Sequence, residues 1–208
     1  MTAGAGAAAL LASYLLGAIP TSFLVGRVFR GIDLREHGSG NLGATNLYRT
    51  LGWKFAVPVA LFDIAKGTVP VLAFAPAVSD SKLFALACGM MAVLGHVYSL
   101  FVRFKGGKGV ATAAGVMLGL SPWAVLALVA IWGAVVFATG YVSLGSVVAA
   151  ALLPLLVWVL HPGSRNLVAL DAVVAAGIIW LHRGNIRRLL AGTESRFGKR
   201  RAAAPPSP

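Results

Sequence analysis

The segment Arg103–Thr112, RFKGGKGVAT, combines three cations with three glycines. Glycines allow successive backbone N–H groups to turn towards one anion, and a helix that begins after them adds the positive end of its dipole. Gly106, Gly107 and Lys108 could therefore hold a phosphate. The segment is not a nucleotide P-loop, because Lys108 is followed by Gly109 where that motif has Ser or Thr. The competing interpretation is a basic loop at a membrane surface in which the glycines provide only flexibility.

A second group of potential anion donors lies in residues 37–52, HGSGNLGATNLYRTLG. Glycines allow a close backbone approach to an oxyanion, and Asn, Ser, Thr and Arg side chains donate hydrogen bonds to it. An ordinary solvated loop would explain the glycines alone, since loops commonly hold Gly, Asn and Ser. The donor side chains of this segment are Ser39, Asn41, Thr45, Asn46 and Arg49.

Two further polar clusters occur later in the chain, in GYVSLGS and LHRGNIRRLLAGTE. Ser143 and Ser146 are spaced to share one helix face, although serines in membrane helices usually bond to their own backbone or to a neighbouring helix. His182 and Asn185 have the same spacing, but a lone histidine at a membrane edge is more often interfacial than catalytic. Glu194 lies in a basic tail, where we expect it to pair with an arginine or cap a helix.

The rest of the chain is strongly apolar. Its 208 residues are 58% hydrophobic and 12% charged, and the mean hydropathy is +0.83, whereas about a quarter of the residues in soluble domains are charged. These values predict an all-α integral membrane protein without a separate soluble domain of ordinary size. The single cysteine, Cys88, excludes an internal disulfide and a cysteine-based metal site.

Charges and turn residues divide the sequence into about seven apolar segments, most of them long enough for a membrane-spanning helix. The fourth is short and rich in Gly and Ala, so a re-entrant segment is an alternative there. We expect one membrane domain at 1–198 and a disordered basic, proline-rich tail at 199–208. The predicted helical segments are 6–28, 54–77, 83–102, 107–120, 122–139, 142–160 and 167–182.

Basic residues predict the orientation of this seven-helix bundle. With the N-terminus outside and the C-terminus in the cytoplasm, all of the 18 Lys and Arg residues except Lys66, Lys82 and Arg165 fall in cytoplasmic segments. The opening MTAGAGAAALLA lacks the basic region of a cleavable signal, so it is expected to begin the first helix. All four polar clusters then lie on the cytoplasmic side, where they could form one phosphate-binding site.

The acidic residues restrict the chemistry. There are only 6 Asp and Glu, too dispersed for the D-x-x-D-G…D cluster of metal-dependent phosphatidyltransferases, and no histidine begins an H-x-x-x-x-D motif. We therefore expect no catalytic metal and no cofactor. Asp63 and Lys66, three residues apart, are predicted to form a structural ion pair rather than a proton relay. With these chemistries excluded, the sequence favours electrostatic catalysis on a phosphorylated substrate.

The net charge of +12 is explained by the membrane topology and by anionic lipid headgroups, so nucleic acid is not an expected partner. Two classes of non-enzyme stay open. A phosphate-ester transporter would need access from the opposite face and repeat symmetry between its halves. A scaffold that binds anionic lipid would need the arginines but neither His182 with Asn185 nor the glycine-rich loops.

Four ordered segments, GSGNLGATNLYR, GHVYSLFVRFKGGKGVAT, YVSLGS and HRGNIRRLLAGTE, closely resemble the signatures of the bacterial acyl-phosphate:glycerol-3-phosphate acyltransferases, the PlsY family. The resemblance covers nearly the whole chain, including GAIP at 17–20 and DIAKG at 63–67. It implies a seven-helix enzyme of the inner membrane with its active site on the cytoplasmic side. The implied reaction moves a fatty acyl group from acyl phosphate to the 1-hydroxyl of sn-glycerol 3-phosphate, giving lysophosphatidic acid and phosphate for phospholipid biosynthesis. A functional partner would be an acyl-carrier-protein-dependent phosphate acyltransferase.

The resemblance also implies residue roles. Asn185 would orient or polarise the reacting groups, and His182 would position the acceptor hydroxyl or take its proton, unless the donor phosphate takes it. Arg49 and Lys108 are expected to hold the glycerol phosphate group. The other implied substrate-binding residues are Ser39, Asn41, Thr45, Asn46, Gly106, Gly107, Ser143 and Ser146.

Two positions depart from the family pattern. Tyr98-Ser99 stands where a Phe-Pro pair is usual, and Gly140 stands where an arginine is expected. The first change is expected to alter a helix end, and the second to remove a phosphate or headgroup contact. Both affect local geometry and substrate preference rather than the core signatures.

Overall fold

The computed structural model describes residues 2–197, and over that range the chain forms helices and loops without a strand. Helices are the expected outcome, because an apolar segment at membrane depth must satisfy its backbone hydrogen bonds internally. The predicted tail at 199–208 lies outside the described residues. The elements are α1 Ala3–Ala18, α2 Thr21–Arg30, η1 Leu34–Glu36, α3 Ala44–Leu51, α4 Trp53–Val69, η2 Pro70–Phe74, α5 Lys82–Val97, η3 Leu100–Val102, α6 Val110–Leu120, α7 Pro122–Thr139, α8 Val142–Leu160, α9 Arg165–Leu181 and α10 Arg183–Leu190.

Five helical stretches of the described chain are long and apolar enough to cross a membrane, and α9 with α10 would add a sixth despite a bend of 56° between them. Helix α6 is apolar but has only 11 residues, which is about 17 Å, against about 30 Å of hydrocarbon in a bilayer. Seven crossings and the orientation therefore stay predictions. The five stretches are Ala3–Arg30, Trp53–Phe74, Lys82–Val102, Pro122–Thr139 and Val142–Leu160.

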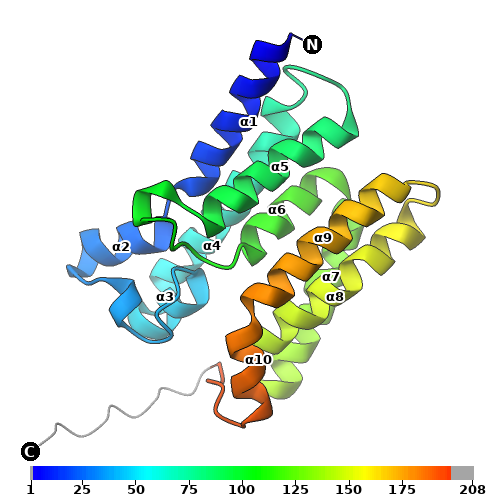
Figure 1. Ribbon diagram of the computed structural model, residues 1–208. Coiled ribbons are helices and arrows are strands. Elements are labelled where there is room, and N and C mark those ends of the chain that lie inside the picture. The colour runs from blue at the N-terminus through cyan, green and yellow to red at the C-terminus, as the bar shows by residue number, and fades with distance from the viewer. Residues whose placement is uncertain (1, 198–208) are drawn as a thin grey trace, which may run out of the picture.

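The long helices form two packed groups (Figure 1). In the first group, α1 packs along α5 and α4 packs along α6. In the second group, α8 contacts both α7 and α9. The contact of α6 with α7 joins the two groups. A site between the two groups would therefore be lined by residues from both of them.

The first predicted helix, 6–28, is interrupted between α1 and α2. Pro20 lacks a backbone N–H and cannot continue the hydrogen-bond ladder of a helix. The carbonyl of Ile19 instead accepts a hydrogen bond of 2.9 Å from Lys66 Nζ. The same carbonyl also accepts from the Thr21 N–H at 3.0 Å. Lys66 therefore adds a hydrogen bond from α4 to a backbone group at the break.

Asp63 and Lys66 form the ion pair that their spacing predicts. Lys66 Nζ lies 2.7 Å from Asp63 Oδ1, and both side chains are buried. Thr21 Oγ1 lies 3.4 Å from the same carboxylate oxygen, and His96 Nδ1 lies 3.8 Å from it. The carboxylate of α4 thus connects α2, α4 and α5 at one level of the bundle.

Ser99, at the position where the family pattern has proline, connects the end of α5 to the end of α1. Its hydroxyl donates to the carbonyl oxygen of Ala18. One residue earlier, the carbonyl of Tyr98 accepts a hydrogen bond of 2.7 Å from the Tyr14 hydroxyl. The departure from the family pattern therefore produces a helix-to-helix contact at this end of α5.

Glycines allow the closest helix contacts in the first group. A Cβ at Gly17 on α1 would overlap the backbone of Ala92 on α5. A Cβ at Gly115 on α6 would overlap the carbonyl oxygen of Ile64 on α4. The approach of α6 to α4 also lets Thr68 Oγ1 donate to the Gly115 carbonyl at 2.8 Å. Such contacts are typical of membrane helices, where close backbone packing replaces the hydrophobic effect.

We predict that Gly115→Ala destabilises the protein by about 1–3 kcal/mol, because the added methyl group forces α6 away from α4. Gly133→Ala is the matched control, because nothing lies within 4 Å of a Cβ added on α7; it should be neutral or stabilise the helix by up to about 1 kcal/mol. Thermal unfolding of the purified variants in lipid nanodiscs makes the comparison. Equal unfolding temperatures for the two variants would contradict the close packing of α4 and α6.

Candidate functional site

A cavity of about 390 Å³ lies between the two helix groups. It is apolar along α6, α7 and α8 and polar where these helices meet α10 and the loop before α3. Side chains from all four polar clusters of the sequence line it, so the fold brings these clusters together at one cavity. The polar and charged lining residues are Ser39, Asn41, Thr45, Asn46, Arg49, Asp63, His96, Lys108, Ser143, Ser146, His182, Asn185 and Glu194.

Asn185 connects the glycine-rich loop to the C-terminal segment. Its Oδ1 accepts a hydrogen bond from Lys108 Nζ, and its Nδ2 donates to Glu194 Oε1 at 2.7 Å. A primary amide carries two N–H donors, and within residues 2–197 only the bond to Glu194 uses Nδ2. The amide is therefore fixed in orientation by partners on both sides while it faces the cavity.

Glu194 is a buried carboxylate that accepts hydrogen bonds from three side chains, one on α8 and two on α10. Ser143 Oγ, at the start of α8, donates to Oε1 at 2.8 Å, and Arg188 Nε of α10 donates to Oε2 at 2.7 Å. Burial alone would raise the pKa of Glu194, but the hydrogen bonds from Asn185, Arg188 and Ser143 lower it below its usual value. The sequence predicted that Glu194 pairs with an arginine or caps a helix, and in the structure it pairs with Arg188.

Lys108 brings a half-buried positive charge to the cavity. Burial is the main cause that lowers the pKa of Lys108 to about 8; Glu194 opposes this effect, and Arg188 and Arg49 add to it. The ammonium group therefore loses its charge at a pH much closer to neutrality than an exposed lysine does. An anion in the cavity would favour its protonated form.

Arg49 supplies the second cation, from α3. Its Nη2 donates to the carbonyl of Ser195 at 3.1 Å, whereas its Nε is buried and has no hydrogen-bond partner within residues 2–197. Burial also lowers the pKa of Arg49, and Glu194 opposes this. A buried N–H without a partner is unfavourable. Arg49 also lines the cavity, so its guanidinium brings positive charge to the polar end.

His182 caps α9 at the junction with α10 and is almost fully buried. Its Nδ1 lies 2.8 Å from the carbonyl oxygen of Ile178. Because a carbonyl can only accept, Nδ1 carries the hydrogen, and in the neutral ring Nε2 is then an acceptor. The ring is thus oriented by its own helix, with the tautomer that could accept a proton from a hydroxyl.

The loop before α3 is organised by Asn46, which is buried. Its Nδ2 donates to the carbonyls of Leu34 and His37 at 3.1 and 2.9 Å, and its Oδ1 accepts from the Ser39 N–H at 2.8 Å. Gly38, with φ 62°, is needed here, because a Cβ would overlap the Asn46 amide. Asn46 lines the cavity as predicted, but its amide holds the loop together.

The glycine-rich loop differs from the predicted phosphate nest. Gly106 N–H donates to the carbonyl of Val97 at 2.9 Å, and Gly107 N–H donates to that of His96 at 3.1 Å. Both amides therefore donate to carbonyls at the end of α5 and do not converge on an anion. The glycines are required for another reason: a Cβ at Gly107 would overlap the imidazole of His96. The two residues close a turn that places Lys108 at the cavity.

The two serines of α8 have different partners. Ser143 bonds to Glu194, whereas Ser146 Oγ donates to the carbonyl of Val142, one turn earlier, at 2.9 Å. Self-bonding is the common behaviour of serine in membrane helices. Ser146 still lines the cavity.

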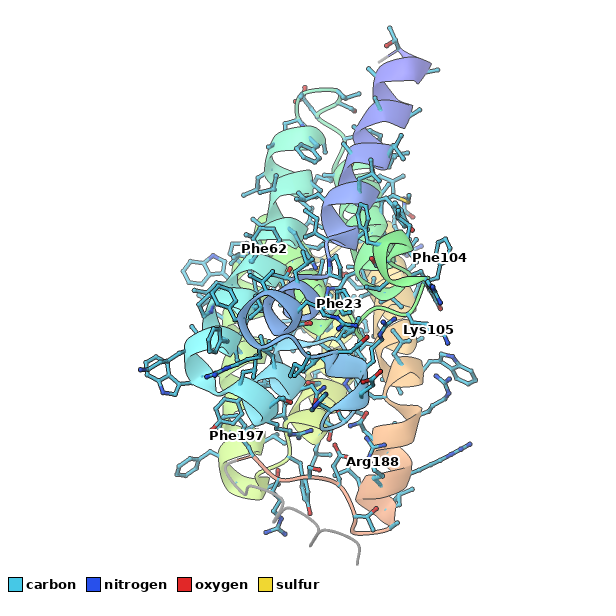
Figure 2. The ribbon with its side chains drawn as sticks, turned by 90° about the vertical axis from the view of Figure 1, so that its left-hand side faces the viewer. Phe23, Phe62, Phe104, Lys105, Arg188 and Phe197 are labelled. Atoms are coloured by element: carbon cyan, nitrogen blue, oxygen red, sulfur yellow. The ribbon has the colours of Figure 1, made fainter. Side chains whose placement is uncertain are left out.

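The C-terminal segment passes over the polar end of the cavity, a feature that the sequence did not indicate. Phe197 stacks on Tyr48 of α3 at 4.5 Å between ring centroids, and its N–H donates to the Gly140 carbonyl at 2.6 Å. Figure 2 shows Phe197 and Arg188 at the same end of the molecule. Arg196 lies beside Gly140 and donates to the Tyr141 hydroxyl at 3.2 Å. The family pattern has an arginine at position 140, and here Arg196 brings an arginine side chain close to that position. Tyr48 and Phe197 are too far apart in sequence for any local pattern to reveal the contact.

Comparisons with known proteins point to one family. Residues 7–192 match the family model described as glycerol-3-phosphate acyltransferase. The glycerol-3-phosphate acyltransferase of Chlorobaculum parvum is 42% identical, over 93% of this chain and 97% of its own. That of Geobacter sulfurreducens is 49% identical, over 89% of this chain and 94% of its own.

Two solved structures share the fold. The crystal structure of PlsY (YgiH), described as an integral membrane glycerol 3-phosphate acyltransferase, matches in its glycerol 3-phosphate form with a TM-score of 0.87 and 39% identity, over 93% of this chain and 96% of that chain. Its lysophosphatidic acid form matches with a TM-score of 0.84 and 38% identity. Because the family match covers most of the chain and the relatives exceed 40% identity, this multi-helix membrane protein belongs to the glycerol-3-phosphate acyltransferase family.

Proposed function

We propose that the protein transfers a fatty acyl group from acyl phosphate to the 1-hydroxyl of sn-glycerol 3-phosphate. The products are lysophosphatidic acid and inorganic phosphate. The observation that carries the proposal is the cavity itself, which has Arg49 and Lys108 at one end and an apolar lining along the rest. Such a cavity suits two phosphorylated head groups beside one hydrocarbon chain. The glycerol 3-phosphate and lysophosphatidic acid forms of the related structure support the same substrate and product.

In the proposed reaction, the acceptor hydroxyl oxygen attacks the carbonyl carbon of acyl phosphate. A new ester C–O bond forms, and the bond from the carbonyl carbon to the phosphate oxygen breaks. The hydroxyl proton passes to His182 Nε2 or to the departing phosphate. Acyl phosphate is already activated, so positioning and charge stabilisation are the main tasks of the enzyme. No step requires a metal, a cofactor or an acyl-enzyme.

Lys108 and Arg49 are the proposed ligands of the glycerol phosphate group. Arg49 Nε is a buried donor without a partner among residues 2–197. Lys108 is held beside Asn185, whose remaining N–H is the proposed donor to the developing oxyanion. Fixed donors at that position stabilise the transition state without reorganising. Ser39, Asn41, Thr45 and Ser146 complete the polar lining.

The site is proposed to face the cytoplasm from the inner membrane of a bacterium. Glycerol 3-phosphate is water-soluble, whereas the acyl chain partitions into lipid, so the two substrates would meet where the apolar part of the cavity opens into its polar end. Acyl phosphate would come from an acyl-carrier-protein-dependent phosphate acyltransferase acting nearby. The product would enter phospholipid biosynthesis.

The first prediction concerns the donor. Purified protein in lipid nanodiscs should release phosphate and form lysophosphatidic acid in equal amounts from acyl phosphate and glycerol 3-phosphate. Acyl-coenzyme A and acyl-carrier-protein thioesters, assayed in parallel, should give no product. Absence of product from acyl phosphate, with protein that unfolds cooperatively, would reject the proposed reaction and favour transport of a phosphate ester.

A second prediction separates the two lysines of the glycine-rich loop. Lys108→Ala should reduce kcat/KM for glycerol 3-phosphate by about a hundredfold or more, because a preorganised cation is removed from the site. Lys105, which is exposed on the surface (Figure 2), is the matched control, and Lys105→Ala should stay within about twofold of the parent protein. Equal losses in the two variants would show that the loop acts only through its overall charge.

A third prediction concerns pH. A lysine binds phosphate in its charged form, which is present below its pKa and lost above it. Because burial lowers the pKa of Lys108 to about 8, kcat/KM for glycerol 3-phosphate should be level below that pH and should fall as the pH rises through it. In Lys108→Arg the guanidinium stays charged, so the fall should move to higher pH. The same alkaline limb in both proteins would show that another group controls it.

A further inference from the structure

The apolar end of the cavity is closed by one hydrophobic cluster. Three helices line the cavity along their length, and the lining residue farthest from the polar end is Met117 on α6, Val125 on α7 and Leu153 on α8. These three residues belong to the same core cluster, together with Ala124 and Val157. All three are buried. The cluster is therefore the floor of the cavity.

The depth of the floor follows from helix geometry. At a rise of about 1.5 Å per residue, Met117 lies roughly 11 Å along α6 from Val110, its first residue, and Leu153 lies roughly 15 Å beyond Ser143 on α8. These depths are about a third to a half of the hydrocarbon thickness of a bilayer. A chain that enters with its activated head near Lys108 would meet the floor with its terminal carbons.

A second void lies behind one of these three residues. It has a volume of about 10 Å³, and Met117 and Ala113 line both it and the large cavity. Ala113 has no side chain beyond Cβ, so the Met117 side chain forms most of the partition. The other residues around the void are Leu86, Met90, Val93, Val116, Asp171 and Val174. Shortening Met117 would join the void to the cavity, whereas Val125 and Leu153 do not border the void.

We propose that Met117 stops the acyl chain and thereby sets the longest acyl group that the enzyme uses efficiently. The inference rests on the proposed acyl transfer. A methionine side chain is unbranched and flexible, so it can fill the end of an apolar cavity whose occupant varies slightly in length. A longer chain must displace the whole cluster at the floor, which is tightly packed and yields little.

The test measures kcat/KM for saturated acyl phosphates of twelve to eighteen carbons at fixed glycerol 3-phosphate. Met117→Ala should raise the ratio of the eighteen-carbon to the fourteen-carbon donor by about tenfold or more, the lower limit for apolar pockets that differ by a methylene. Met117→Phe should shift the preference to shorter donors. Met117→Leu, which nearly conserves volume, should keep the parent profile.

The matched control is Met90→Ala. Met90 borders the small void but not the large cavity, so its truncation enlarges the void and leaves the partition intact. The donor profile should then stay unchanged. An unchanged profile in both Met117→Ala and Met117→Phe, or an equal shift in Met90→Ala, would overturn the proposal.

A second readout needs no turnover. Lysophosphatidic acids of increasing chain length should raise the unfolding temperature of the parent protein up to a limiting length, and Met117→Ala should extend that limit. Failure of every acyl phosphate as a donor would reject the proposed reaction, whereas this binding series would still report on Met117. A limit that is the same in both proteins would reject the role of Met117 even if acyl transfer is confirmed.

Discussion

The arrangement of the site depends on compensation of charge by one buried carboxylate. Arg49, Lys108 and Arg188 gather around a partly dehydrated space, where like charges repel strongly. Glu194 offsets this repulsion and also accepts hydrogen bonds from Ser143 and Asn185. Without the carboxylate, the cations would lower one another's affinity for protons and move apart. With it, they stay in place and keep a net positive charge for an anionic substrate.

The same carboxylate connects segments that are far apart in the chain. Glu194 follows α10, yet its partners come from α8 and α10 and reach the glycine-rich loop through Asn185. The aromatic contact between Phe197 and Tyr48 adds α3 to this assembly. The polar end of the cavity is therefore one hydrogen-bonded unit, whereas the apolar end is built by helix packing. The polar end needs fixed hydrogen-bond partners and the apolar end needs close helix packing, and the cavity between the helix groups combines the two.

Glycine has two separate uses in this protein. Gly17 and Gly115 bring helix backbones together in the first helix group, and this packing fixes the wall of the cavity that α4 and α6 provide. Gly107 instead makes room for the His96 ring, which lies near the Asp63 and Lys66 pair. His96 thus lies between the turn that precedes Lys108 and a buried ion pair of α4, although neither Asp63 nor Lys66 is close to that turn in sequence.

The sequence by itself determined the helical membrane class, the ion pair of Asp63 with Lys66 and the meeting of four polar clusters, because hydropathy and short spacings are local properties. It also identified the family, since ordered motifs survive in the linear chain. It did not determine the break after α1, where Lys66 donates to the Ile19 carbonyl, or the hydrogen bonds of the Gly106 and Gly107 amides to the end of α5. Only the tertiary structure decided these points, as well as the contact of Tyr48 with Phe197 and the partition at Met117. Hydrogen-bond partners and cavity walls come from segments remote in sequence, and a group that is already paired in the fold cannot serve the site that its local pattern suggests.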